Sequence, residues 1–149
     1  MAVSDITDSE SSLLERCRVY LKNIPESLHY ITPTQLAERL RDNPDWATII
    51  DNRDAASYAR AHIPGAIHVP LRDAADEENL AKLPRDRRIV VACWVGHTAS
   101  QLLTILRLLG YDAIGLKYGM GEPAIPDESK LGWEEIGLAT ERRSREDTE

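Results

Sequence analysis

The sequence predicts an α/β fold in which helices cover both faces of a mostly parallel sheet. Short apolar runs rich in β-branched residues alternate along the chain with segments of helical periodicity. Parallel strands need such crossover helices between them, and strands that are apolar throughout suit a sheet covered on both sides. The 149 residues show no internal repeat, so we expect one domain of this kind and no tandem pair.

Two helices are predicted before the first long strand. Over residues 9–22, apolar side chains recur at helical spacing and indicate an amphipathic helix. A second helix begins after Thr32, a favourable N-cap residue, with Pro33 at its first position and Gln35 completing a capping box. Because proline disfavours helix in the residue before it, Pro44 should end this helix near position 43.

The rest of the chain alternates between strand and helix signals. The predicted strands are 46–51, 66–70, 87–93 and 112–117. The predicted helices between them are 54–62, 71–83 and 98–110, of which 71–83 is acidic and solvated. We therefore divide the chain into an N-terminal extension (1–30), a core domain (31–138) and a charged tail (139–149) that we expect to be disordered.

Composition excludes several classes of protein. The net charge is −7, from 25 acidic and 18 basic residues, which argues against nucleic acid or an anionic membrane as the main partner. The two cysteines form neither a disulfide framework nor a zinc pattern, and no apolar stretch is long enough to span a membrane. The N-terminal segment is acidic where a secretory leader would be basic and then apolar. We expect a cytoplasmic protein.

Cys93 is the strongest candidate for a reactive side chain. It follows the strongest strand signal, at the edge of the sheet where α/β proteins place their sites, and a short loop leads from it into a helix. Gly96 permits a tight backbone turn, and Thr98 is expected to cap that helix. Inward-facing amides in such a loop would stabilise a thiolate, giving an ionised and exposed nucleophile. The alternative is that Cys93 is a small buried apolar residue.

Three stretches resemble the rhodanese family. "IIDNRDAASYARAHIPGAIHVPL" resembles the rhodanese signature, "IVVACWVGHTAS" resembles the rhodanese active-site loop, and "LLGYDAIGLKYGM" resembles the segment that follows it. The resemblance covers residues 31–121. It implies a rhodanese-like α/β fold with a sheet of about five strands and a single-domain sulfurtransferase.

The resemblance also implies a mechanism without a metal or organic cofactor. Cys93 would accept a sulfane sulfur as a covalent persulfide and pass it to cyanide, a thiol or a protein acceptor. The donor would be a small sulfane-sulfur compound. The residues expected to cradle the outer sulfur are Trp94, Val95, Gly96, His97, Thr98 and Ala99.

The loop differs from the corresponding loops of two groups of related enzymes. Rhodanese-like phosphatases and arsenate reductases have a longer loop ending in arginine, but Ala99 stands six positions after Cys93, so phosphate-ester chemistry is not expected. Well-known thiosulfate sulfurtransferases resemble "CRxG", whereas Trp94 and Val95 occupy the basic positions here. Thiosulfate should therefore bind weakly. His97 is either a hydrogen-bonding contact or an exposed loop residue.

Several other residues allow two interpretations. Asp51 and Arg53 either hold loops together as an ion pair or lend positive potential to the site, and Met120 either contacts substrate or packs. Cys17 either fills the core or forms a disulfide with Cys93.

Two residues are expected to have structural roles. We expect His62 to fix the turn before Gly65 by bonding to backbone or to a carboxylate, and Trp133 to anchor the C-terminal segment.

Three functions remain open from the sequence. The leading one is a sulfurtransferase, favoured by Cys93 and Gly96. The second is a non-catalytic module that binds a protein or a small anion, favoured by the lack of basic loop residues, and the third is a redox domain using both cysteines. The sequence does not specify the oligomeric state.

Overall fold

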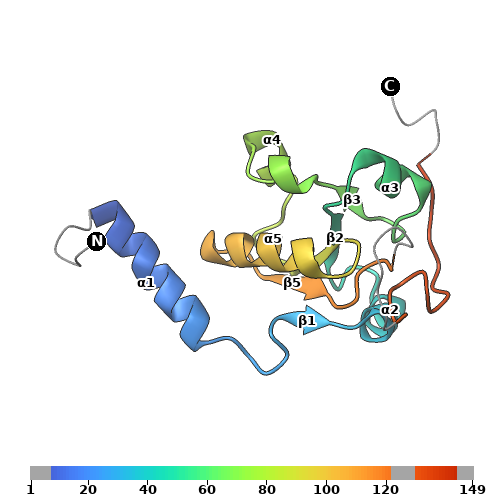
Figure 1. The fold of residues 1–149 in the computed structure, drawn as a ribbon, viewed down its shortest axis with the longest axis horizontal. Helices are drawn as coiled ribbons and strands as arrows, with labels where there is room; N and C mark the ends of the chain where they lie inside the picture. Colours follow the sequence, from blue (N-terminus) through green and yellow to red (C-terminus); the bar gives the residue numbers. More distant parts are fainter. Residues whose placement is uncertain (1–7, 122–129, 144–149) are drawn as a thin grey trace.

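The computed structural model describes residues 8–121 and 130–143 and contains a five-stranded sheet that is parallel throughout (Figure 1). Its strands are β1 (Tyr30–Ile31), β2 (Thr48–Asp51), β3 (Ile67–His68), β4 (Ile89–Ala92) and β5 (Ala113–Leu116). They lie in the order β1-β5-β4-β2-β3. The predicted α/β class with a parallel sheet of about five strands is confirmed. The sequence did not reveal β1, since two residues are too few to show periodicity.

The helices lie near the predicted positions, with one correction. They are α1 (Asp8–Lys22), α2 (Pro33–Asp42), α3 (Ala55–Arg60), α4 (Glu77–Leu80), α5 (His97–Leu108) and the 3₁₀ helix η2 (Leu71–Asp73). A single helix over 71–83 is wrong, because η2 and α4 divide the segment. The buried Asn79 side chain donates to the Asp73 carbonyl at 2.8 Å and so takes an acceptor that a continuous helix would use.

Capping at α2 follows the sequence closely. The Gln35 amide donates to the Thr32 hydroxyl at 3.2 Å, and the Gln35 side chain accepts from the Thr32 amide at 3.0 Å. Pro33 occupies the first turn, and the helix ends with Asn43 as its C-cap. The predicted capping box is confirmed.

The two faces of the sheet bury separate apolar clusters. All four residues of β4 are buried, and they alternate between the clusters. Ile89 and Val91 pack with Leu102 and Leu103 of α5 on one face, whereas the other face packs against α2 through Leu36. Strand β4 is thus the central strand of the sheet. Packing on both of its faces fixes the position of its carboxyl end, from which the Cys93 loop begins.

Helix α1 lies beside α5 and buries little of its surface (Figure 1). It is joined to α5 by a bond from the Arg16 guanidinium to the Leu108 carbonyl at 3.3 Å and by a Tyr20–Thr104 hydroxyl contact at 3.3 Å. The predicted amphipathic helix is present. None of the helices in the described ranges has the length and apolarity needed to cross a bilayer.

The C-terminal segment continues along the domain further than expected. Glu141 pairs with His62 in an antiparallel bridge, so the chain up to Arg143 is not the disordered tail predicted from residue 139. Charge alone suggested disorder, whereas buried His62 supplies a partner for the Glu141 carboxylate at 3.2 Å. The remainder of the predicted tail, 144–149, lies outside the described residues.

Helix α3 is capped by Asp54, which provides a pH-dependent test of the fold. The Ser57 N–H donates to the Asp54 carboxylate at 2.7 Å, and this bond lowers the pKa of Asp54. The stabilisation is therefore complete above the ordinary carboxyl pKa and is lost as pH falls through the lower folded value. We expect Asp54→Ala to reduce the free energy of unfolding by about 1 kcal/mol at pH 7.

Chemical denaturation between about pH 7 and pH 3 checks this prediction. The difference between the wild type and Asp54→Ala should shrink as the pH falls. Asp54→Asn is the control, since its amide oxygen still caps the helix but does not titrate. A difference that stays constant with pH would contradict the role of the carboxylate.

Candidate active site

Cys93 lies directly after β4, at the carboxyl edge of the sheet. Strand β4 runs between β2 and β5, with Ala92 in register with Asp51. Parallel pairing therefore brings the loops after three neighbouring strands to the same edge as the thiol. These loops begin at Asn52, Cys93 and Lys117.

The Cys93 sulfur receives a hydrogen bond from the start of α5. The Gly96 amide donates to Sγ at 3.0 Å. Gly96 is the N-cap of the 12-residue α5, with a φ of 109° that favours glycine. The sulfur thus lies at the N-terminus of α5, where a backbone N–H points at it and the helix dipole is positive. Thr98 is not the cap, contrary to expectation, because the helix already begins at His97.

Two backbone hydrogen bonds join the turn after β5 to the loop that begins at Cys93. The amide of Met120 donates to the Cys93 carbonyl, and that of Gly121 to the Trp94 carbonyl, both at 2.8 Å. Because C=O and N–H point in opposite directions across a trans peptide, the next two amides, those of Trp94 and Val95, point away from this turn. The carbonyls of Cys93 and Trp94 are thereby hydrogen-bonded to this turn, away from the sulfur.

Asn52 holds the far side of the loop. Its side-chain amide donates to the Thr98 carbonyl at 3.0 Å, and the Thr98 hydroxyl donates to the Asn52 side-chain oxygen at 3.1 Å. Asn52 is 2% exposed, so water does not compete for these bonds. No pattern in the sequence pointed to a role for Asn52. Its position between Asp51 and Arg53, at the end of the strand beside β4, was the available signal.

Tyr30 and Ser100 form a second support that the sequence did not suggest. The Tyr30 hydroxyl is hydrogen-bonded to the Ser100 hydroxyl, which donates to the Gly96 carbonyl at 2.8 Å. Burial raises the pKa of Tyr30, and the nearby Cys93 acts in the same direction. Tyr30 precedes Ser100 by 70 positions, so no local pattern connects them.

The thiol is enclosed, which corrects the expectation of an exposed sulfur. Cys93 is 1% exposed and belongs to the apolar cluster that includes Ala99, Leu102 and Leu103. Among the loop residues, His97 is exposed. Trp94, Val95 and Thr98 are half-buried, whereas Gly96 and Ala99 are buried. The predicted loop surrounds the sulfur more tightly than its sequence indicated, because apolar packing from α5 closes one side.

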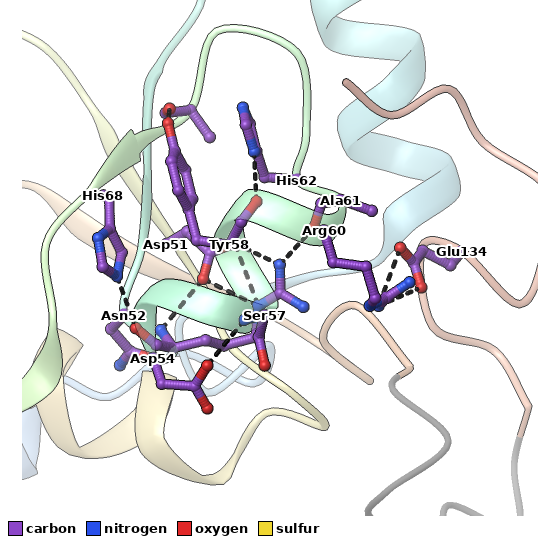
Figure 2. Close-up of polar contacts among 12 residues, drawn as sticks. Asp51, Asn52, Asp54, Ser57, Tyr58, Arg60, Ala61, His62, His68 and Glu134 are labelled. Atoms are coloured by element: carbon purple, nitrogen blue, oxygen red, sulfur yellow. Dashed lines mark hydrogen bonds and ion pairs between the residues drawn. The ribbon is translucent and has the colours of Figure 1, made fainter. Parts of the chain in front are cut away.

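Asp51 and Arg53 form a buried ion pair. The Arg53 Nη2 lies 2.8 Å from the Asp51 Oδ2, both side chains are 0% exposed, and Arg53 also donates to the Ala61 carbonyl at 2.6 Å. The His68 ring bonds the Arg53 carbonyl at 2.8 Å, and Figure 2 shows Asp51 and His68 gathered beside α3. Of the two interpretations, the structure has the ion pair that holds loops together, with the guanidinium charge compensated by Asp51.

Met120 packs in the core. Its side chain is 0% exposed and joins the apolar cluster around Leu36, so the packing interpretation agrees with the structure. Its backbone contributes to the site through the bond to the Cys93 carbonyl.

His62 and Trp133 have the structural roles expected of them. The His62 ring bonds the Tyr58 carbonyl at 2.7 Å and the Glu141 carboxylate, and Glu141 also accepts from the Gly65 amide at 2.7 Å. The Tyr58–His62 contact is visible in Figure 2. The Trp133 indole donates to the Ala139 carbonyl at 2.9 Å and anchors the C-terminal segment.

Cys17 lies on α1 and is half-buried, and both cysteines are free thiols. Within residues 8–121 and 130–143, no three His, Cys, Asp or Glu side chains converge in a way that would hold a metal ion.

The chain is similar to known proteins. Residues 32–122 match the family model described as "Rhodanese-like domain". Residues of this chain are 35% identical over 91 positions to the probable adenylyltransferase/sulfurtransferase MoeZ of Mycobacterium tuberculosis, covering 60% of this chain and 23% of MoeZ. They are 27% identical over 103 positions to the thiosulfate sulfurtransferase GlpE of Pseudomonas savastanoi pv. phaseolicola, covering 67% of this chain and 93% of GlpE.

Solved structures agree with these relatives. The Alr3790 protein of Anabaena sp. is 29% identical with a TM-score of 0.63, covering 75% of this chain and 80% of that chain. The chain spans less than a quarter of MoeZ, so the activity of that whole protein is not transferred to it. The match to the family model extends over more than half of the sequence and includes strands β2 to β5 and the Cys93 loop. The chain therefore belongs to the rhodanese-like domain family.

Proposed function

We propose that this protein is a sulfurtransferase that carries sulfane sulfur as a persulfide on Cys93. The observation that carries the proposal is the 3.0 Å hydrogen bond from the Gly96 amide to the Cys93 sulfur, made at the N-terminus of α5. In sulfur transfer, an N–H donor at this position would stabilise the negative charge that the sulfur carries when it attacks or leaves. Its relatives include proteins named as sulfurtransferases.

The reaction needs two displacement steps. The Cys93 thiolate attacks the terminal sulfur of a donor R–S–SH, the S–S bond of the donor breaks, and RS⁻ leaves with the electron pair while Cys93 becomes a persulfide. An acceptor thiolate or cyanide then attacks the outer sulfur and releases the Cys93 thiolate. No net oxidation or reduction occurs. The covalent persulfide takes the place of a cofactor.

The loop residues favour an organic donor and a thiol or protein acceptor. Residues 94–99 include no lysine or arginine, so thiosulfate would meet no fixed positive charge from this loop. Trp94 and Val95, the two apolar residues that follow Cys93, are half-buried, so part of each is open to a donor or a partner. Because Cys93 is only 1% exposed, the loop must open for the donor to enter. Free thiols and a labile persulfide suit a reducing compartment such as the cytoplasm.

A second candidate is a non-catalytic module that binds a protein or a small anion. The enclosed sulfur and the absence of basic loop residues favour it. In that case the Gly96 amide would satisfy a buried thiol and would not activate it.

Intact-mass measurement separates the two candidates. We expect incubation with an organic persulfide to add one sulfur, about 32 Da, that a reducing agent removes. Cys93→Ser should abolish the addition, and Cys17→Ser, the matched control, should retain it. Thiosulfate should load the protein poorly. A chain that gains no sulfur from any donor would favour the binding module, and a loss of two hydrogens would indicate a Cys17–Cys93 disulfide.

A further inference from the structure

We propose, on the basis of the sulfur-transfer function above, that Tyr30 and Ser100 are positioning residues for Cys93. They hold Gly96 in the one orientation that places its amide on the sulfur. The two hydroxyls and the Gly96 carbonyl form a continuous chain of hydrogen bonds, which we call the hydroxyl relay.

Hydrogen counting fixes the direction of the relay. The Ser100 hydroxyl has one proton, and it donates this proton to the Gly96 carbonyl at 2.8 Å. The Tyr30 hydroxyl must therefore donate to the Ser100 oxygen. The raised pKa of Tyr30, caused mainly by burial, keeps the phenol protonated and able to donate. Each bond thus depends on the one before it.

Gly96 needs such support because of its backbone. Glycine loses more conformational freedom on folding than any other residue, and a φ of 109° is one of many conformations open to it. The Gly96 carbonyl accepts from both the Ser100 amide, at 3.1 Å, and the Ser100 hydroxyl. The Gly96 carbonyl and amide lie in adjacent peptide planes, so holding the carbonyl restricts the rotation about the Gly96 Cα that would move the amide away from the Cys93 sulfur, 3.0 Å from it.

Tyr30 is itself held in place by unusual backbone. Leu28 and His29, directly before it, both have left-handed conformations, with φ of 55° and 61°. Such residues cost free energy and persist where the surroundings require them. The Tyr30 ring also packs over Gly115, where an added Cβ would lie 3.2 Å from the ring. The backbone is therefore strained at residues 28–29, directly before Tyr30. The absence of a side chain at Gly115 leaves room for the Tyr30 ring, whose hydroxyl bonds Ser100.

Single-turnover sulfur loading tests the relay. At saturating organic persulfide we expect Ser100→Ala and Tyr30→Phe each to load sulfur roughly tenfold more slowly, the effect of one lost hydrogen bond. The donor concentration for half-maximal rate should not change, because neither residue contacts the donor. Ser100→Thr, which keeps a hydroxyl, should restore the rate. Tyr20→Phe is the matched control, since it removes another tyrosine hydroxyl bonded to α5, at Thr104.

The double variant gives the sharpest result. Because both hydroxyls act through the same carbonyl, Tyr30→Phe with Ser100→Ala should be no slower than Ser100→Ala alone. Additive losses, or single variants as fast as Tyr20→Phe, would overturn the relay.

Deuterium exchange separates failure of the relay from failure of the proposed function. If the wild type acquires no sulfur, the proposed function fails, and exchange at the Gly96 amide then decides the relay. Faster exchange in Ser100→Ala than in Tyr20→Phe supports the relay, and equal exchange overturns it.

Discussion

Gly119→Ala is expected to lower the free energy of unfolding by about 2 to 5 kcal/mol, since a left-handed φ and a steric clash both oppose the new methyl group. Gly119 has a φ of 58°, and an added Cβ would lie 2.5 Å from the carbonyl oxygens of both Cys93 and Trp94. Those atoms are backbone and cannot rotate away. The substitution must therefore displace the Cys93 loop or the turn beneath it, and sulfur loading should fall with stability.

Gly137→Ala is the matched control. Its φ of 82° is also left-handed, but an added Cβ would meet no atom within 4 Å. It should show only the conformational cost, about 1 to 2 kcal/mol. Urea denaturation of both variants measures the difference. Equal losses would mean that the turn yields to the methyl group without resistance and does not hold the loop as tightly as its geometry indicates.

Arg53→Met is expected to lower the free energy of unfolding by about 3 to 5 kcal/mol, because it leaves the Asp51 carboxylate buried without its ionic partner. Both side chains are fully buried, and the guanidinium also bonds the Ala61 carbonyl that ends α3. Desolvation makes the unpaired charge costly, so most of the loss comes from Asp51.

Two further variants test this explanation by urea denaturation. Arg60→Met removes the partially exposed pair with Glu134, 3.0 Å apart, and should cost at most about 1 kcal/mol. Combining Arg53→Met with Asp51→Leu should recover part of the stability, because the buried charge is then gone. A double variant less stable than Arg53→Met alone would show that Asp51 contributes through bonds other than the ion pair.

The elements predicted well are those with strong local signals. The capping box at Thr32 specifies the start of α2 because its two reciprocal bonds span only three residues. The apolar, β-branched run 89–92 is typical of a buried strand, which the structure has as β4, and Cys93 follows the carboxyl end of that strand. Where local signals compete, the prediction failed. The acidic segment 71–83 has helical composition, but the Asn79 side chain divides it by bonding the Asp73 carbonyl.

Local patterns were enough to predict the fold class, the family and the position of Cys93 after the central strand, because periodicity and short motifs are properties of short stretches. How Cys93 is held depends on contacts between distant parts of the chain. The Asn52 bonds to Thr98 and the bond from Tyr30 to Ser100 join residues 46 and 70 positions apart. Such contacts depend on which strands become neighbours in the sheet, and no short stretch of sequence specifies that order.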